Sequence, residues 1–122
     1  MKVLLGVGGS DDSLRALSRA LERAREAGDD LTIAVLDNPE SPRAIDEVEQ
    51  AVRDRLADSG IDATVRRLEG DPGSQLVDVA EREGFERIVL GGGETSPLGK
   101  IRLGSIAEFV VLNASVTVTL VR

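Results

Sequence analysis

Glycine clusters follow two apolar segments of the chain, and glycines in such loops let backbone N–H groups approach an anion. One cluster is Gly8-Gly9-Ser10, and the other opens the stretch "GGGETSPLGKIRLGS" at residues 91–105. Both patterns are typical of a loop that holds phosphate. Glycine also serves tight turns and close helix–sheet packing, so the spacing alone leaves both roles open.

The 91–105 stretch ends where an apolar pattern of helical spacing begins. Gly104, Ser105 and Ile106 would then present N–H groups that no helical carbonyl satisfies. A helix N-terminus of this kind is an anion site. Neither G-x-G-x-x-G nor a Walker sequence follows the first apolar segment, which excludes a standard dinucleotide site and a P-loop.

The residue types argue against catalysis. The chain has no histidine and no cysteine, so it lacks the commonest general base, the commonest metal ligand and any thiolate. The loop carboxylates Asp37, Glu69 and Asp71 are expected to cap helices or face solvent. We therefore predict no catalytic residue and no metal site. A binding module is favoured over an ATPase, and nothing supports a redox or ligase domain.

Composition bounds the class of protein. The 122 residues suit one domain, residues 1–122, and the net charge of −7 argues against a nucleic-acid partner. Only two of the 15 basic residues are lysines, which is typical of halophilic proteins. No apolar run approaches a membrane span or a signal peptide, so we expect a cytoplasmic protein with no membrane partner.

Short apolar segments alternate with amphipathic helical patterns along the whole chain. The predicted helices begin at Ser10, Ser41-Pro42, Asp71-Pro72 and Ser105, the last through a capping box. This alternation predicts an α/β fold in which every strand is parallel and helices cover both faces. The predicted strands are residues 2–7, 31–36, 63–68, 87–90 and 116–121.

The chain resembles the universal stress protein family in three segments. Gly91 and Gly104-Ser105 match parts of the family's glycine signature, "VGGSDDSLRAL" at 7–17 resembles its first strand-to-helix turn, and 70–91 resembles its third helix and fourth strand. The resemblance covers nearly the whole chain, with a shortened connection after the second strand. It implies a three-layer, Rossmann-like α/β sandwich of the adenine nucleotide alpha hydrolase-like type, with strand order 3-2-1-4-5.

The resemblance also implies a stress-response or signalling module with ATP or AMP as candidate ligands. In ATP-binding members the signature loop wraps the phosphates, and the end of the second strand offers backbone to the adenine. The alternative is an ATP- or AMP-binding member with slow ATPase activity. Carried over to this chain, the candidate binding residues are Gly8, Gly9, Ser10, Val35, Leu36, Gly91, Gly92, Gly93, Glu94, Gly104, Ser105 and Ile106.

Two positions depart from the family pattern. Glu94 replaces the second signature glycine, and Gly8 replaces an aspartate that is usual in nucleotide binders. A carboxylate about 4 Å from a phosphate costs about 4 kcal/mol at an effective dielectric constant of about 20, before screening by ions. Lys100 and Arg102 in the same loop could offset it. We therefore expect no nucleotide or a weak one first, an AMP-like ligand second, and ATP with a metal third.

The last predicted strand suggests a homodimer. Val116 to Val121 mostly alternates valine with threonine, which suits an edge strand with one less buried face. An uncovered edge invites a second copy, paired antiparallel across a two-fold axis. The family resemblance adds that dimers of this kind are common there. Phe109, Val110 and Val111 are apolar residues of the last predicted helix, and we expect them to extend the interface.

Overall fold

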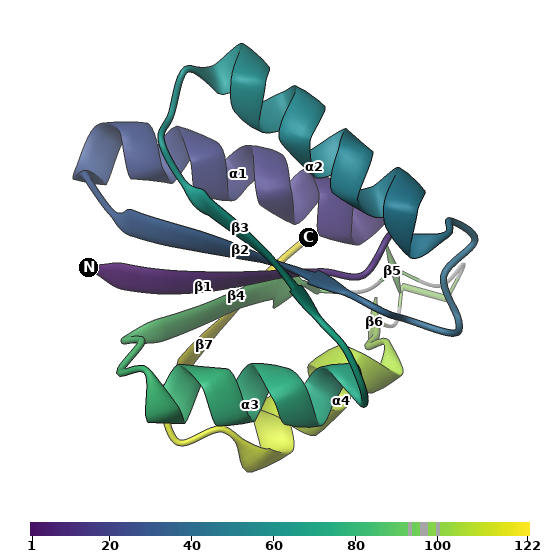
Figure 1. Ribbon diagram of the computed structural model, residues 1–122. Coiled ribbons are helices and arrows are strands. Elements are labelled where there is room, and N and C mark those ends of the chain that lie inside the picture. Colours follow the sequence, from purple (N-terminus) through teal and green to yellow (C-terminus); the bar gives the residue numbers. More distant parts are fainter. Residues whose placement is uncertain (93, 96–97, 100) are drawn as a thin grey trace.

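Five parallel strands form one sheet in the order β3-β2-β1-β4-β7, with helices on both faces (Figure 1). The computed structural model describes residues 1–92, 94–95, 98–99 and 101–122. The predicted topology is therefore confirmed. The strands of the sheet are β1 (Lys2–Val7), β2 (Asp30–Leu36), β3 (Thr64–Leu68), β4 (Arg87–Gly91) and β7 (Thr117–Val121).

The helices form two outer layers, α1 and α2 on one face of the sheet and α3 and α4 on the other (Figure 1). Because each strand is extended and alternates its side chains, each face of the sheet carries its own apolar core. No helix in the described part of the chain is long and apolar enough to cross a membrane. The helices are α1 (Asp11–Ala27), α2 (Ile45–Ser59), α3 (Pro72–Arg82) and α4 (Ser105–Asn113).

Two of the predicted helix starts are confirmed. The Ser10 hydroxyl accepts a hydrogen bond from the Ser13 N–H at 3.3 Å, and Asp71 accepts one from the Ser74 N–H at 3.0 Å. These side chains satisfy N–H groups that the first helical turn leaves free. The ends also agree: Gly28 closes α1 in the left-handed conformation, with φ of 69°.

The predicted start of α2 is wrong. The helix begins at Ile45 with Ala44 as its N-cap, whereas Ser41 was expected to cap it. The Ser41 hydroxyl instead accepts the Arg43 N–H at 3.1 Å and closes a local turn. Because the Ser41 hydroxyl is engaged in this turn, it does not cap the helix, which begins four residues later.

The predicted capping box of α4 is also wrong. Gly104 is the N-cap, with no side-chain cap, and Ser105 is the first helical residue. The Ser105 hydroxyl donates to the Glu40 carboxylate at 3.2 Å, so it is engaged across the fold. A partner 65 residues away in sequence cannot be found from local spacing.

The loop after β4 carries a short antiparallel ladder between β5 (Glu94–Thr95) and β6 (Ile101–Arg102). The alternation of elements predicted no antiparallel strand, and this prediction is confirmed for the five-stranded sheet but wrong for this loop. Turning back on itself lets the loop pair backbone N–H and C=O groups that would otherwise need water. Figure 1 shows the ladder at the end of the sheet where the β1 and β2 loops lie.

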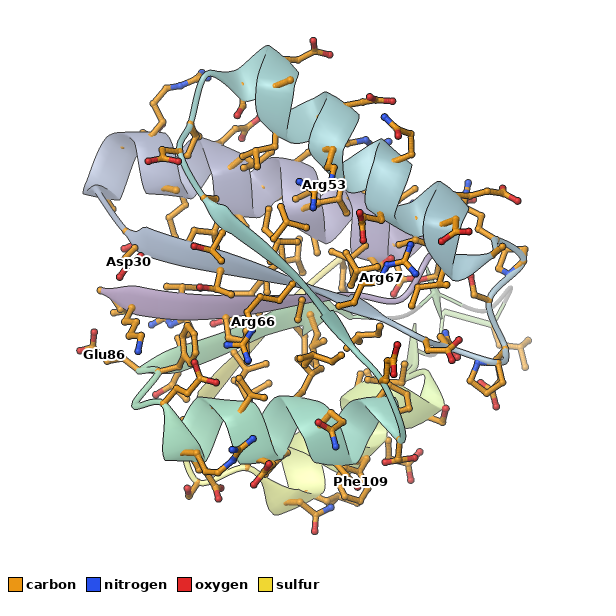
Figure 2. The ribbon with its side chains drawn as sticks, viewed as in Figure 1. Asp30, Arg53, Arg66, Arg67, Glu86 and Phe109 are labelled. Carbon is orange, nitrogen blue, oxygen red and sulfur yellow. The ribbon has the colours of Figure 1, made fainter. Side chains whose placement is uncertain are left out.

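Neighbouring arginines on the edge strand β3 anchor helices on opposite faces. Arg66 pairs with Glu83 at the end of α3 at 2.7 Å, and Arg67 pairs with Glu49 of α2 at 2.6 Å. In Figure 2 the two side chains point away from each other, as strand alternation requires. Arg67 also contacts Asp46. β3 is an edge strand of the sheet, and these arginines connect it to the helix layers on both faces.

These contacts predict sensitivity to acid. Arg67 first, then Arg53, lowers the pKa of Glu49 below its usual value, and Arg66 lowers the pKa of Glu83. The hydrogen bond from the Ser74 N–H lowers the pKa of Asp71. A lowered folded-state pKa adds stability above the unfolded pKa, about 4, and that stability is lost as pH falls through the folded value.

We therefore expect the melting temperature to fall steadily from pH 5 to pH 2, measured by circular dichroism. Glu49→Gln should flatten part of this fall, whereas Glu26→Gln, at an exposed residue of α1, should leave it unchanged. A melting temperature that stays constant down to pH 3 would contradict the assignment.

Candidate functional site

Three segments far apart in sequence meet beyond the carboxyl ends of β1 and β2. A Cβ atom added at Gly8 would lie 3.3 Å from Asn38 Nδ2 and 3.5 Å from Ile106 Cδ1. The β1 loop, the β2 loop and the first turn of α4 therefore converge on Gly8. This is the edge of an open α/β sheet where ligands bind, beside the point where the strand order reverses.

Gly9 is required by geometry. Its φ of 93° lies in the region that disfavours side chains, and an added Cβ would contact Ser41 Oγ and lie 2.8 Å from Val48 Cγ2. The next residue, Ser10, uses its hydroxyl to cap α1. The cluster expected to face a ligand thus also supports the turn and the close approach of the β2–α2 connection.

The β2–α2 connection supplies site residues that the sequence analysis did not single out. Asn38 forms a compact turn, in which its side-chain oxygen accepts the Glu40 N–H at 3.0 Å and its backbone oxygen accepts the Ser41 N–H at 3.1 Å. Arg43 donates to the Gly9 carbonyl and pairs with Asp11 at 3.0 Å. The Asn-Pro sequence after a strand was the available signal for the turn.

The two glycines at the end of β4 serve close packing. A Cβ at Gly91 would lie 2.6 Å from Asp12 Oδ2 and 2.8 Å from the Ser13 nitrogen, so the strand end touches the first turn of α1. A Cβ at Gly92 would lie 2.8 Å from Arg122 Cγ, and the Gly92 N–H donates to Val121 at 2.7 Å. The glycine spacing left open whether these residues bind phosphate or allow close packing, and their contacts show close packing.

The first turn of α4 is the most open part of the site. No atom of the described residues lies within 4 Å of a Cβ built on Gly104, whose φ is −67°. Ser105 and Glu108 are exposed, and Ile106 is half-buried toward Gly8. The Glu40 carboxylate accepts the Ser105 hydroxyl, so a negative charge from the protein itself lies at this helix N-terminus.

The remaining predicted residues are only partly placed. Val35 and Leu36 lie inside β2 with buried side chains, and the Leu36 carbonyl already accepts the Asn38 N–H at 3.1 Å. Glu94 belongs to β5, and its backbone pairs with Arg102. Gly93 and Lys100 lie outside the described residues.

The site therefore combines helix N–H groups, an amide at Asn38, a guanidinium at Arg43 and a carboxylate at Glu40. Such a set can hold one anionic group beside a polar heterocycle or sugar. Among the described residues, no three carboxylates gather in a way that could hold a metal ion.

Comparisons with known proteins agree with this architecture. A universal stress protein of Methanocaldococcus jannaschii is 28% identical over 142 aligned residues, which cover 99% of this chain and 81% of that protein. The solved universal stress protein from Archaeoglobus fulgidus superposes with a TM-score of 0.80 at 25% identity, covering 100% of this chain and 98% of the other.

A universal stress protein solved in complex with cAMP superposes with a TM-score of 0.76 at 28% identity, covering 100% of this chain and 96% of the other. The sequence model described as the Universal stress protein family matches residues 1–122. The match spans the glycine loops, the helices that they open and the whole parallel sheet, so the chain belongs to the universal stress protein family.

Proposed function

We propose that this domain is a stress-response binding module that holds an adenosine monophosphate-type ligand weakly and disfavours ATP. The observation that carries the proposal is the Glu40 carboxylate at the N-terminus of α4, 3.2 Å from the Ser105 hydroxyl. That helix end is where a phosphate would be expected. The Glu40 carboxylate already partly neutralises the positive end of the helix dipole and repels a negatively charged ligand. The repulsion increases with each phosphate that the ligand carries.

Two further observations support this reading. The relative solved with cAMP shares the fold and 28% of its residues with this chain, and its ligand has a single phosphate group. The second signature glycine is replaced by Glu94, which adds a carboxylate to the loop. With no histidine or cysteine in the chain, binding is favoured over hydrolysis. We place this activity in the cytoplasm, where adenine nucleotides are abundant.

The test is calorimetric titration of the whole chain with AMP, cAMP and ATP, with GMP as the control for base recognition. AMP or cAMP should bind measurably, and ATP no more tightly than either. ATP binding more than tenfold tighter than AMP, or release of ADP on incubation, would instead support the alternative, an ATP-binding member with slow ATPase activity.

We also propose that two copies pair through β7. This strand pairs only with β4, so its other edge is open within the described sheet. Phe109, Val111 and Leu112 on α4 are exposed apolar side chains that could extend the contact. Val110, expected to take part, is fully buried in the core against the sheet and is excluded.

Thr117→Lys, at an exposed position of β7, should convert a dimer to a monomer, because a charged side chain on an edge strand opposes pairing with a second copy. Thr64→Lys, the same change on the opposite edge strand β3, is the matched control and should leave the mass unchanged. Light scattering in molar KCl, at tens of micromolar protein, measures the molar mass of both variants. A monomer mass for the unmodified chain would rule out this assembly.

The net charge of −7 predicts that stability rises with salt. The Debye length falls from about 10 Å at 0.1 M to about 3 Å at 1 M, which weakens repulsion among surplus carboxylates. The ion pairs that salt also weakens are mostly exposed and worth about 0–1 kcal/mol each. A melting temperature that is flat or falls between 0.1 and 3 M KCl would contradict a halophilic character.

The control for the salt effect is a variant with less charge. Replacing Glu22, Glu26 and Asp58 by their amides removes three exposed carboxylates and changes the net charge from −7 to −4. The rise in melting temperature with KCl should become shallower in this variant.

A further inference from the structure

A cavity separate from the candidate nucleotide site lies under the C-terminal half of α1, on the face of the sheet that α1 and α2 cover. Its volume is about 100 Å³, enough for several water-sized groups. Val3, Leu31 and Val89 form an apolar floor from β1, β2 and β4. The cavity runs from Arg87, the first residue of β4, to Val121, the last residue of β7, and none of its lining residues belongs to the candidate nucleotide site.

The sequence explains why a space remains here. Ala16, Ala20 and Ala24 recur at helical spacing and are buried against the sheet, and Ala20 lines the cavity. A methyl group cannot fill the distance that a leucine would span. On the strand side, β4 alternates, so Arg87 and Val89 face α1 while Ile88 lies in the opposite core.

Arg87 is the unusual residue of this cavity. Its Nε atom is buried and has no hydrogen-bond partner among the described residues. A buried donor without a partner is uncommon in folded proteins and calls for an explanation. A bound group that accepts a hydrogen bond from the Arg87 guanidinium would provide this explanation.

The charge around the cavity is positive although the chain is acidic. Three arginines, Arg19, Arg23 and Arg87, line it together with one carboxylate, Asp29. Arg23 is paired with Asp29 at 3.1 Å, and no ion pair joins Arg19 or Arg87 to any described residue. Two guanidinium groups are therefore available beside an apolar floor. Arginine matches the planar geometry of a carboxylate with two parallel hydrogen bonds.

We propose that this cavity binds a small organic carboxylate with a compact apolar body. The carboxylate would pair with Arg87 and Arg19, and the apolar body would lie on Val3, Leu31 and Val89. An inorganic anion fits less well, because it would leave the apolar floor wet or empty. The universal stress domain would then carry two ligand sites that share no lining residue, one beyond the carboxyl ends of β1 and β2 and one between α1 and the sheet.

The test uses isovalerate as the probe on the whole chain, followed by amide NMR at constant ionic strength set with KCl. Saturable shifts are expected at Ala20, Val89 and Thr119. Isovaleramide, which has the same shape without the charge, and inorganic phosphate, which has charge without the apolar body, should both bind at least about tenfold more weakly. Equal binding by either compound overturns the proposal.

Variants locate the site. Arg87→Met should weaken isovalerate binding by about tenfold or more, and Ala20→Leu should abolish it by filling the cavity. The matched control is Arg82→Met, at an exposed position of α3 on the other face of the sheet. This variant should bind isovalerate as tightly as the unmodified chain does. Thermal melts check that each variant is folded.

Unchanged binding in both folded cavity variants, or no saturable shift in the unmodified chain, overturns the proposal. The outcome is independent of the nucleotide proposal. In the same spectra AMP should shift Gly8 and Gly104, and isovalerate should not.

Discussion

A Gly91→Ala substitution is expected to lower the free energy of unfolding by about 2–3 kcal/mol and the melting temperature by roughly 10 °C. The added Cβ would lie 2.6 Å from Asp12 Oδ2, and 2.8 Å from both the Asp12 carbonyl carbon and the Ser13 nitrogen. Two of these three atoms belong to the backbone of a helix. They cannot move away as a flexible side chain would, so β4 and α1 must separate.

Gly104→Ala is the matched control within the same glycine signature. An added Cβ there meets no atom within 4 Å in the described part of the chain, and φ is −67°, which any residue adopts. The expected cost is at most about 1 kcal/mol, from replacing a glycine N-cap by alanine. Chemical denaturation of the two variants measures the difference.

Equal losses of stability in the two variants would show that Gly91 is not selected by packing. The expected difference would separate two roles within one motif. Gly91 lets a strand end approach a helix, whereas Gly104 lies at the first turn of α4, where we propose that a phosphate binds.

Removing carboxylates from the candidate nucleotide site should strengthen ATP binding by about tenfold for each change. Glu94→Gly restores the glycine of the family signature. Glu40→Gln removes the charge beside Ser105 and retains an oxygen that can accept its hydroxyl. Like charges about 4 Å apart cost about 4 kcal/mol at a dielectric constant of about 20, and tenfold is 1.4 kcal/mol, so the estimate allows for strong screening.

The gain should be smaller for AMP than for ATP, because AMP brings fewer negative charges to the same helix end. Glu26→Gln, at an exposed position of α1, is the control for the general loss of a negative charge and should change neither affinity. Tight ATP binding by the unmodified chain that Glu94→Gly and Glu40→Gln leave unaltered would refute the electrostatic explanation. Calorimetry at two KCl concentrations measures how far salt screening reduces the gain in ATP affinity.

Local sequence determined most of the elements of this protein. The solid apolar runs of β1 and β2 predicted buried parallel strands, and both lie in the centre of the sheet. Ser10 and Asp71 cap the helices that they were predicted to cap. These features depend on residues within a few positions of one another, so spacing and side-chain chemistry were sufficient to predict them. The strand order came from the family resemblance, since alternation alone does not specify it.

Tertiary structure decided how the site is built. Glu40 contacts Ser105 across 65 residues of sequence, which turned an expected helix cap into a link between two loops. Glycine is needed at position 91 because Asp12 and Ser13 of α1 leave no room for a side chain there. The positions of these partners follow from the packing of helices on the sheet. No local pattern encodes that packing, because each contact depends on where the whole fold brings two distant segments together.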